Sequence, residues 1–226
     1  MSGKKKILRF AILLFAVPAV IVIGTVAAGS RAYVWLSICV AVLSCVPFFI
    51  AFEKKSGTGR MLILAVMVAL SVLGRFAFSA LPHFKPVTAI VVIAGIYLGA
   101  ESGFLCGALS AVLSNIIFGQ GPWTPFQMFS WGLIGFLAAV TSPLLKKSKL
   151  ALAIYGVFSG ILFSLLMDGF SALWAEGKFS LSRYGAFIVA ALPVTAVYAV
   201  SNVIFLLALS ALMGEELERI TKKYGI

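Results

Sequence analysis

The sequence is poor in charge: Asp, Glu, Lys and Arg make up 11% of its 226 residues, whereas 62% are hydrophobic. A soluble domain of this length could not bury so much apolar surface, so part of that surface must face lipid. Only 7 residues are acidic against 18 Lys and Arg, which gives a net charge of +11. Because the basic residues lie mostly between apolar runs, their excess indicates membrane topology and not nucleic-acid binding.

Residues that carry catalysis are also scarce. The chain has one histidine, His83, which excludes a two-histidine metal site, and its three cysteines lack metal-ligand spacing. The pair Gly177-Lys178 lacks the earlier glycine and the following Ser or Thr of a phosphate-binding loop. An intramembrane hydrolase would normally show two or more acids at depth, or an acid with a histidine, and only Asp168 is available. We therefore expect no enzyme activity, no cofactor, no metal and no ATP hydrolysis by this chain.

Long apolar runs dominate what is present, and we predict an all-α integral membrane protein. The first run follows Lys4, Lys5 and Lys6 like a signal peptide, but its length of about 20 residues suffices to span a bilayer. The fourth and fifth runs are short, so this pair either spans incompletely or packs as a bent hairpin inside the bundle. The eight runs, each expected to be a membrane helix, are 7–28, 33–52, 61–81, 86–99, 102–118, 124–145, 150–174 and 184–213.

The polar segment before residue 61 divides the chain. We predict two N-terminal membrane helices and a loop over 1–60, a six-helix core over 61–213, and a cytoplasmic tail over 214–226. With both termini in the cytoplasm, most of the 18 Lys and Arg fall on the cytoplasmic side. The loops 81–86, 118–124 and 175–183, which are rich in aromatic residues, then face outward.

Small residues recur at four-residue spacing on several predicted helices. Gly95, Gly99, Gly103 and Gly107 form one ladder, which we interpret as a surface for close packing inside the bundle. The pair at 65 and 69 lies near the cytoplasmic end of its helix. Ala65 and Ala69 could therefore contact another subunit.

Two charged residues fall within apolar runs. An unpaired charge at bilayer depth costs at least about 2.5–3.5 kcal/mol, so Arg75 should have a partner or a wet cavity. Asp168 is the obvious partner, and we predict that the two form an ion pair. Such a pair would fix the register of two helices, anchor a substrate, or do both.

Polar and aromatic residues gather in the predicted outer loops. Pro82 and Pro86 restrict the turn between them, which carries the candidate ligand-binding residues His83, Phe84 and Lys85. Tryptophans at a membrane boundary often act as interfacial anchors, whereas amides near helix ends need hydrogen-bond partners that a ligand could supply. The candidates around the next outer loop are Asn115, Gln120, Trp123, Thr124, Gln127 and Trp131.

From residue 61 to 144 the chain resembles the substrate-binding S component of energy-coupling-factor (ECF) vitamin transporters. The resemblance rests on the stretches AVMVA at 65–69, GRF at 74–76, FKPVTAI at 84–90, GAESGF at 99–104, SN at 114–115 and FGQGPWTPFQ at 118–127. The resemblance implies that the protein lies in a bacterial cell membrane. It also implies capture of a vitamin outside, docking on a membrane scaffold subunit that carries two cytoplasmic ATPase subunits, rotation in the bilayer, and release of the vitamin inside.

The resemblance also implies roles for single residues. Ala65 and Ala69 match the alanine pair that contacts the scaffold, and substrate contacts in the family come from the outer loops and later helices, which include Asp168 and Trp174 here. The stretch at 118–127 looks most like cobalamin-type members. An amide-rich outer surface with little net charge suits cobalamin or a corrinoid precursor, whereas folate would need more cations.

Three other functions compete with this interpretation: an ion-coupled secondary transporter, an integral membrane enzyme acting on a lipid or isoprenoid, and an assembly subunit without a ligand. Secondary transporters usually show repeated halves and several intramembrane acids. The single deep carboxylate and the lack of a visible repeat in the sequence argue against the first of these.

Overall fold

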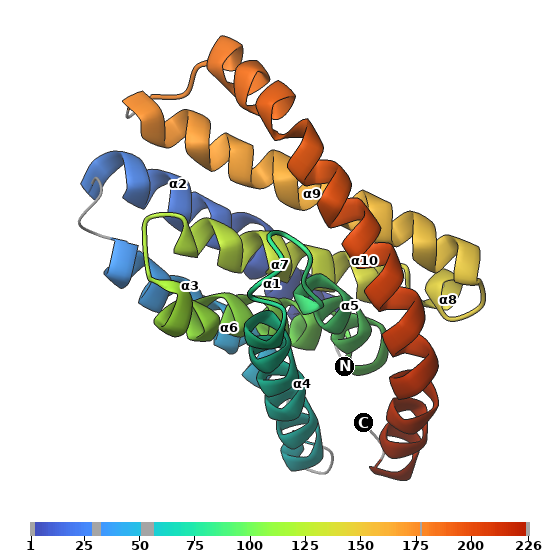
Figure 1. Cartoon of the computed structure of the whole chain (residues 1–226). Helices are drawn as coiled ribbons and strands as arrows, with labels where there is room; N and C mark the ends of the chain where they lie inside the picture. Colours follow the sequence, from blue (N-terminus) through green and yellow to red (C-terminus); the bar gives the residue numbers. More distant parts are fainter. Residues whose placement is uncertain (1–2, 29–32, 51–56, 177, 225–226) are drawn as a thin grey trace.

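The structure, a computed structural model, describes residues 3–28, 33–50, 57–176 and 178–224. Every regular element in these ranges is helical, which confirms the predicted all-α class (Figure 1). The elements are α1 (Gly3–Ala11), the π-helical turn η1 (Ile12–Ala16), α2 (Val17–Ala28), α3 (Tyr33–Ile50), α4 (Gly57–Ala77), α5 (Val87–Leu98), α6 (Ala100–Phe118), α7 (Thr124–Val140), α8 (Ser142–Leu145), α9 (Lys149–Glu176) and α10 (Leu181–Tyr224).

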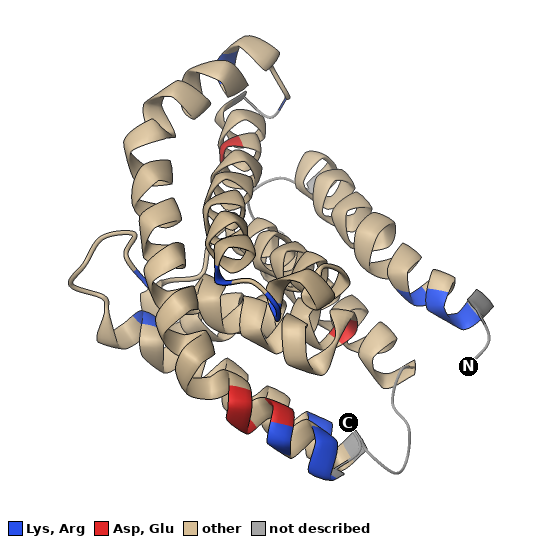
Figure 2. Ribbon diagram, turned by 90° about the vertical axis from the view of Figure 1, so that its right-hand side faces the viewer, with Lys and Arg blue, Asp and Glu red and all other residues tan. Residues whose placement is uncertain are grey.

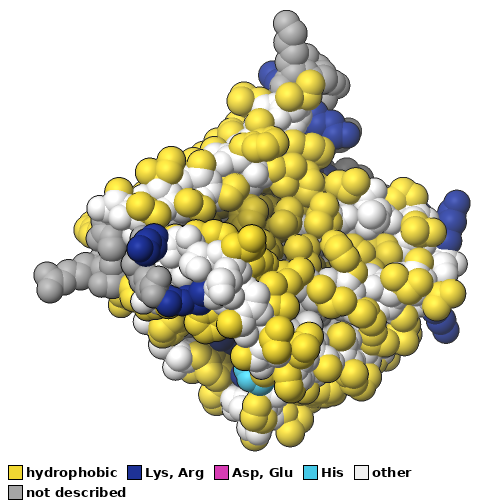
Figure 3. All heavy atoms as spheres, turned by 90° about the horizontal axis from the view of Figure 1, so that it is seen from above, with side chains coloured by type: hydrophobic (Ala, Val, Ile, Leu, Met, Phe, Trp, Pro, Cys, Tyr) yellow, Lys and Arg dark blue, Asp and Glu magenta, His cyan; other side chains and the backbone are white. Residues whose placement is uncertain are grey.

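Six helices in the described ranges are long and apolar enough to cross a membrane. Charged residues lie mainly near the helix ends (Figure 2), and hydrophobic side chains cover most of the face seen in Figure 3. An apolar belt with charges at its ends is what a bilayer requires. The six spans are Lys5–Ala27, Tyr33–Ile50, Thr58–Ala77, Ala100–Phe118, Lys149–Ala175 and Leu181–Lys223.

Two of the eight predicted membrane helices are shorter than expected. Helix α5 has 12 residues and α7 has 17, or about 18 Å and 26 Å, against a hydrocarbon core of about 30 Å. Helix α5 is almost entirely buried, and Gly99 turns the chain into α6 with a φ of 93° that favours glycine. The fourth and fifth runs thus form the bent hairpin that the sequence left as one of two alternatives, and α5 is too short to cross the hydrocarbon core by itself.

Glycines let α5, α6 and α7 pack with their backbones nearly touching. A Cβ at Gly103 would lie 2.5 Å from the Gly135 carbonyl oxygen, and a Cβ at Gly107 would lie 2.4 Å from the backbone carbon of Trp131. Gly95 also packs against Gly135. The predicted packing role thus holds for three members of the ladder, while the fourth, Gly99, forms the turn. This close approach fixes the backbone of α7 at Trp131.

The N-terminal helices α1–α3 pack against α6 and α7. On this interface the rings of Phe10 and Phe136 lie edge to face with centroids 4.7 Å apart, and Arg9 forms an ion pair with Glu101. No sequence pattern indicates that these two charges form a pair. The predicted domain boundary at residue 60 stays a prediction, because residues 51–56 lie outside the described ranges.

Helices α9 and α10 form a long hairpin that packs against α5 and α7, drawn from yellow through orange to red in Figure 1. Close contacts hold the hairpin together: a Cβ at Gly160 would lie 2.7 Å from the backbone nitrogen of Ala199. Helix α10 has 44 residues and continues through Tyr224, so residues 214–224 extend the same helix. The hairpin supplies one wall of a cavity whose other walls are α4, α5 and α7.

Candidate ligand-binding cavity

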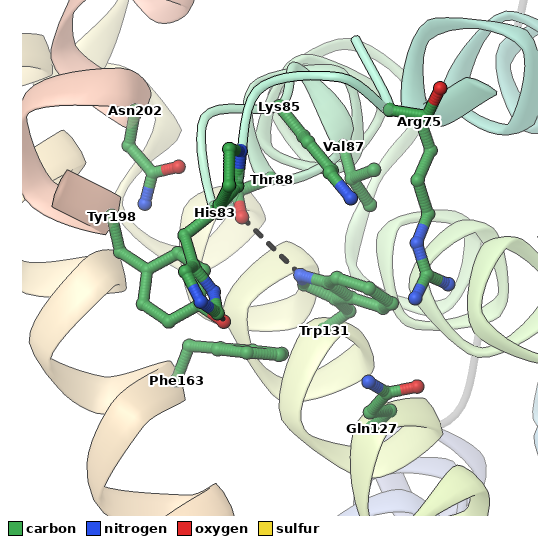
Figure 4. Close-up of a pocket in the computed structure, with 12 residues that line it drawn as sticks. Arg75, His83, Lys85, Val87, Thr88, Gln127, Trp131, Phe163, Tyr198 and Asn202 are labelled. Carbon is green, nitrogen blue, oxygen red and sulfur yellow. Dashed lines mark hydrogen bonds between the residues drawn. The ribbon is translucent and has the colours of Figure 1, made fainter. Parts of the chain in front are cut away.

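A cavity of about 400 Å³ opens where α4 ends and α5 begins (Figure 4). It draws side chains from α4, α5, α7, α9, α10 and the segment 78–86, so it depends on the packing of the whole core. The lining residues are Arg75, Ser79, Pro82, His83, Lys85, Val87, Thr88, Gln127, Trp131, Phe163, Tyr198 and Asn202.

Arg75 lies in the last turn of α4 and points into the cavity. Its guanidinium carbon lies 4.8 Å from the ring centroid of Phe118 and 5.4 Å from that of Trp131. Nη1 donates hydrogen bonds to Ser114 Oγ and, at 2.8 Å, to Asn115 Oδ1. These partners are neutral, so they orient the guanidinium and leave its positive charge available to a ligand.

Asn115 of α6 is buried behind the cavity and connects two elements of its wall, α4 and α7. Besides accepting from Arg75, its Nδ2 donates to Thr124 Oγ1 at 2.9 Å and to Gln127 Oε1 at 2.8 Å. Because the Gln127 oxygen is occupied in this way, Gln127 presents its Nε2 to the cavity as a donor. Asn115 thus positions two lining residues without lining the cavity itself.

Lys85 brings a second cation to the same cavity. Its Nζ lies 5.2 Å from the ring centroid of Phe118. Its backbone is tied to α10, because its N–H donates to Ser201 Oγ at 3.0 Å and its carbonyl accepts from that hydroxyl at 3.3 Å. Burial, and next the positive charge of Arg75, lower the pKa of Lys85. No Asp or Glu is among the described residues that line this cavity.

Aromatic rings form a continuous wall that begins beside Arg75. Trp131 and Phe163 stack with centroids 5.0 Å apart and an interplanar angle of 22°, and Tyr198 lies 5.3 Å beyond Phe163 (Figure 4). His83 ends the row with Nδ1 3.1 Å from Tyr198 Oη, at a φ of 61° that is unusual for a residue with a side chain. Trp131 Nε1 donates to Thr88 Oγ1 at 3.3 Å. The cavity can therefore hold a planar ring beside a negative group.

Comparison with known protein families identifies the chain. Residues 59–223 match the family described as the substrate-specific component of ECF transporters. The chain belongs to this family. As an S component it recognises the substrate of a transporter, and S components in general work with a scaffold and an ATPase module. The chain has no match among solved structures.

Seven of the substrate-binding residues predicted from the sequence of this S component lie in or directly behind the cavity. Five of them line it: Arg75, His83, Lys85, Gln127 and Trp131. Asn115 and Thr124 form the hydrogen-bond network behind them. Whether these residues bind the substrate stays a prediction.

The other five candidates lie elsewhere. Phe84 packs against Phe78 and Phe205, and Gln120 donates to the carbonyl of Val112 on α6. Trp123 covers Gly121, where a Cβ would lie 2.3 Å from the indole. Trp174 stacks on Phe170, and Asp168 accepts from Ser164 on its own helix. These contacts stabilise loops and helix ends, and none of the five lines the cavity.

The predicted ion pair between Arg75 and Asp168 is wrong for the structure described. The two do not pair, because Arg75 faces α6 and α7, where a hydroxyl, an amide oxygen and two aromatic faces satisfy it. Asp168 lies on α9, where its Oδ2 is 3.5 Å from Ser164 Oγ. Neutral oxygens and aromatic faces thus serve as the partners of the Arg75 guanidinium, in place of the predicted carboxylate.

Sequence reasoning did not find the cavity residues that lie on the late helices. Tyr198 and Asn202 lie one turn apart on α10, and Phe163 lies on α9. A usable signal was present: Thr195, Tyr198 and Asn202 recur at three- and four-residue spacing within an apolar run, which puts them on one helix face. The other lining residues that were not predicted are Ser79, Pro82, Val87 and Thr88.

Ala65 and Ala69 are exposed on α4, on a different face of the S component. They line an apolar groove of about 580 Å³ whose other walls include Phe48 of α3 and Leu105 and Leu109 of α6. Their small side chains leave α4 accessible along this groove. The N-terminal helices therefore reach the surface on which the alanine pair lies.

Proposed function

We propose that this S component captures a compact, anionic, ring-containing vitamin or related nutrient in the cavity between α4 and α10. A single observation carries the proposal: the cations Arg75 and Lys85 converge on an aromatic-walled cavity, and no acid is among its described lining residues. Two adjacent cations without a countercharge favour a carboxylate or phosphate as their partner.

Each part of the wall would recognise one part of such a molecule. Arg75 would hold the anionic group through charge-assisted hydrogen bonds, with Lys85 as a second cation. The stacked Trp131 and Phe163 would contact the ring, because aromatic faces favour offset or edge-to-face partners. Gln127 and Asn202 would serve the remaining polar atoms. A few placed polar groups in a largely apolar wall are typical of small-molecule sites.

The size of the cavity bears on the cobalamin hypothesis. A volume of about 400 Å³ lies near the lower end of the roughly 300–1,000 Å³ found for small-molecule sites. A corrinoid, with a macrocycle and many amide side chains, would require the segment 78–86 to move away. The cations also argue for an anion in place of a nearly neutral amide-rich ligand. Cobalamin stays a prediction from the sequence, and the geometry supports a smaller substrate better.

A binding screen on the purified chain tests the proposal. Calorimetry would compare nicotinate, biotin and folate with the neutral nicotinamide and with cyanocobalamin. We expect an anionic ring compound to bind, and we expect Arg75→Gln to weaken its binding about tenfold or more. Lys178→Gln, which removes a cation that does not line the cavity, is the matched control and should bind like the wild type.

Two results would overturn the proposed substrate class. One is binding of cyanocobalamin without binding of any anionic compound, which would restore the corrinoid hypothesis. The other is unchanged affinity for the anion in Arg75→Gln, which would show that the cations do not recognise it.

We further propose that the termini face the cytoplasm, that the cavity opens outward in a bacterial cell membrane, and that Ala65 and Ala69 contact the scaffold. The excess of Lys and Arg at one end of the spans supports this orientation. The exposure of both alanines on an apolar groove supports the docking surface. Labelling of a cysteine introduced at Gln120 in intact cells would test the orientation, since no label would contradict it.

A further inference from the structure

A second polar cavity, of about 260 Å³, lies at the opposite end of α5 from the first. The first cavity is lined by Val87 at the start of α5, whereas this one is lined by Ile96 and Tyr97 near its end. The turn between α8 and α9, the first residues of α9 and part of α10 complete the wall. The lining residues are Ile96, Tyr97, Leu145, Lys146, Lys147, Ser148, Lys149, Leu152, Leu207, Ser210 and Ala211.

Three lysines converge on this cavity. Lys146, Lys147 and Lys149 line it, and no Asp or Glu is among its described lining residues. The ammonium group of Lys146 lies over the ring of Tyr97, with Nζ 4.5 Å from the ring centroid. Figure 2 looks onto the side of the molecule where α8 and the start of α9 lie, and blue Lys and Arg segments face the viewer there. Like charges that line one cavity repel one another unless an anion lies among them.

The beginning of α9 adds hydrogen-bond donors to the same wall. Ser148 caps the helix, since its Oγ accepts from the N–H of Ala151 at 3.2 Å and its carbonyl accepts from the N–H of Leu152 at 3.0 Å. The helix that starts here has 28 residues. Its first turn presents backbone N–H groups and the positive end of the helix dipole, both of which favour an anion.

One acid acts on this cluster without lining the cavity. Glu218 of α10 attracts Lys146, but its carboxylate is already paired with Lys222, with Oε1 and Nζ 2.9 Å apart. The exposed position of that pair on the helix surface makes it a weak competitor. The three lysines of the cavity therefore keep a net positive charge.

Most of the remaining lining side chains are apolar. Leu145, Leu152 and Leu207 lie in the same cavity as the lysines, which gives it one cationic and one apolar part. The membrane span of α9 begins at Lys149, so the lysines lie at a boundary between hydrocarbon and water. A phosphate attached to hydrocarbon chains matches both parts, because basic pockets between membrane helices bind lipid headgroups.

We propose that this second cavity binds a phosphate group, supplied by an anionic phospholipid of the cytoplasmic leaflet. The phosphate would contact the lysines and the first turn of α9, and the acyl chains would follow the apolar side chains. The lipid would then hold the ends of α5, α9 and α10 together. Nothing in this inference depends on the nutrient that the first cavity binds.

Native mass spectrometry of the full-length chain, reconstituted with phosphatidylglycerol and phosphatidylcholine in equal amounts, tests the proposal. We expect retention of one phosphatidylglycerol. The triple variant Lys146→Gln, Lys147→Gln and Lys149→Gln should weaken its binding on the order of 100-fold, from the contribution of each lysine near a membrane surface. The matched control, Lys4→Gln, Lys5→Gln and Lys6→Gln, removes the same charge elsewhere and should retain the lipid.

A second variant keeps every lysine and therefore tests the cavity itself. Ser210→Phe would fill the space from α10, and it should also release the lipid while the chain remains folded by circular dichroism. Competition with inorganic phosphate separates the two sources of the phosphate group. Complete loss of phosphatidylglycerol from the chain in millimolar phosphate would support the phosphate site but assign it to a soluble ligand. Equal loss from both triple variants, or equal retention of phosphatidylcholine, would overturn the proposal.

Discussion

Arg9 of α1 and Glu101 of α6 form an ion pair, with Nη1 and Oε1 3.3 Å apart and both side chains largely buried. Arg9 precedes the family match, which starts at residue 59, and Glu101 lies within it. The pair therefore joins the additional N-terminal helices to the family core. Removal of one partner leaves the other charge buried, so Arg9→Ala should lower the stability in detergent by about 3–5 kcal/mol. Thermal unfolding followed by tryptophan fluorescence would measure this.

Two further variants show whether the buried charge is the cause. The double change of Arg9→Met and Glu101→Leu removes both charges and should recover most of the lost stability. Arg219→Ala breaks an exposed pair with Glu216 and should change the stability by less than about 1 kcal/mol. A double variant as unstable as Arg9→Ala would show that packing, and not an unpaired carboxylate, explains the loss.

Gly107 on α6 lies so close to α7 that an added methyl group would collide with its backbone. A Cβ there would lie 2.4 Å from the carbonyl carbon of Trp131, which belongs to the rigid helix and cannot yield as a flexible side chain would. Gly107→Ala should therefore cost about 1–3 kcal/mol of stability by overpacking. It should also weaken ligand binding, because Trp131 would shift relative to Arg75.

Gly185→Ala is the matched control, since no atom lies within 4 Å of a Cβ at that position. It should leave the melting temperature unchanged or slightly raised. Calorimetry of ligand binding and thermal unfolding would be done on both variants. Normal behaviour of Gly107→Ala in both measurements would mean that α6 and α7 can separate without disturbing the cavity.

The sequence predicts the helices well because hydropathy and glycine spacing act locally. The runs at 86–99 and 102–118 and the ladder that includes Gly103 gave a buried hairpin close to the one found. The cavity was harder to predict, because its composition depends on how each helix is rotated about its axis. Phe163 and Tyr198 are aromatic residues in long apolar runs, so composition could not separate them from lipid-facing neighbours.

The prediction of a carboxylate partner for Arg75 failed for a related reason. A long guanidinium can reach several groups, and the sequence places Ser114 and Asn115 about 40 residues away, with no indication that they face α4. The absence of an acid from the described cavity lining also follows from this packing. The sequence predicts a nearly neutral ligand because Lys and Arg are scattered along the outer loops. In space, however, Arg75 and Lys85 line the same cavity.

Asn115 offers a test of indirect positioning. Asn115→Asp keeps the size of the side chain, but it removes the two Nδ2 hydrogen bonds and gives Arg75 a carboxylate partner. The anionic ligand would then compete with an internal anion, so its affinity should fall about tenfold or more, as expected for a charged hydrogen bond. Calorimetry with the best ligand of the screen would measure this.

Gln120→Glu is the control for this amide-to-acid change. Gln120 lies outside the cavity and donates to the Val112 carbonyl, so the variant should lose some stability and keep its affinity. A stronger loss of affinity in Gln120→Glu than in Asn115→Asp would place the ligand near residue 120 and away from Arg75.

Lys85 predicts a pH dependence of binding. Burial and the charge of Arg75 lower its pKa below the ordinary value of about 10.4. Between the lowered and the ordinary value the unfolded chain binds more protons, so stability should rise with pH through this window. Ligand affinity should move the other way, because an anion prefers the charged lysine and loses it as the pH rises through the lowered pKa.

Lys85→Arg separates this effect from general changes at high pH. Arginine stays protonated, so the affinity of the variant should remain constant from about pH 7 to about pH 10, whereas that of the wild type declines. Dissociation constants measured across this range decide the matter. Parallel curves for the two proteins would show that another group titrates.

Ala65 and Ala69 predict a separation of binding from transport. Both are exposed on an apolar groove, so the double change Ala65→Phe and Ala69→Phe fills space that lipid or a partner occupies and should not disturb the core. The variant should bind the ligand like the wild type. In proteoliposomes that contain the scaffold and ATPase subunits, its ATP-driven uptake should nevertheless fall to background, because the scaffold could no longer approach α4 closely.

Leu62→Phe is the control. It changes an exposed residue of α4 that lines a different groove, beside α10, and the variant should transport normally. Undiminished uptake by the double variant, or uptake by the wild type without the ATPase subunits, would exclude the alanine pair as the coupling surface.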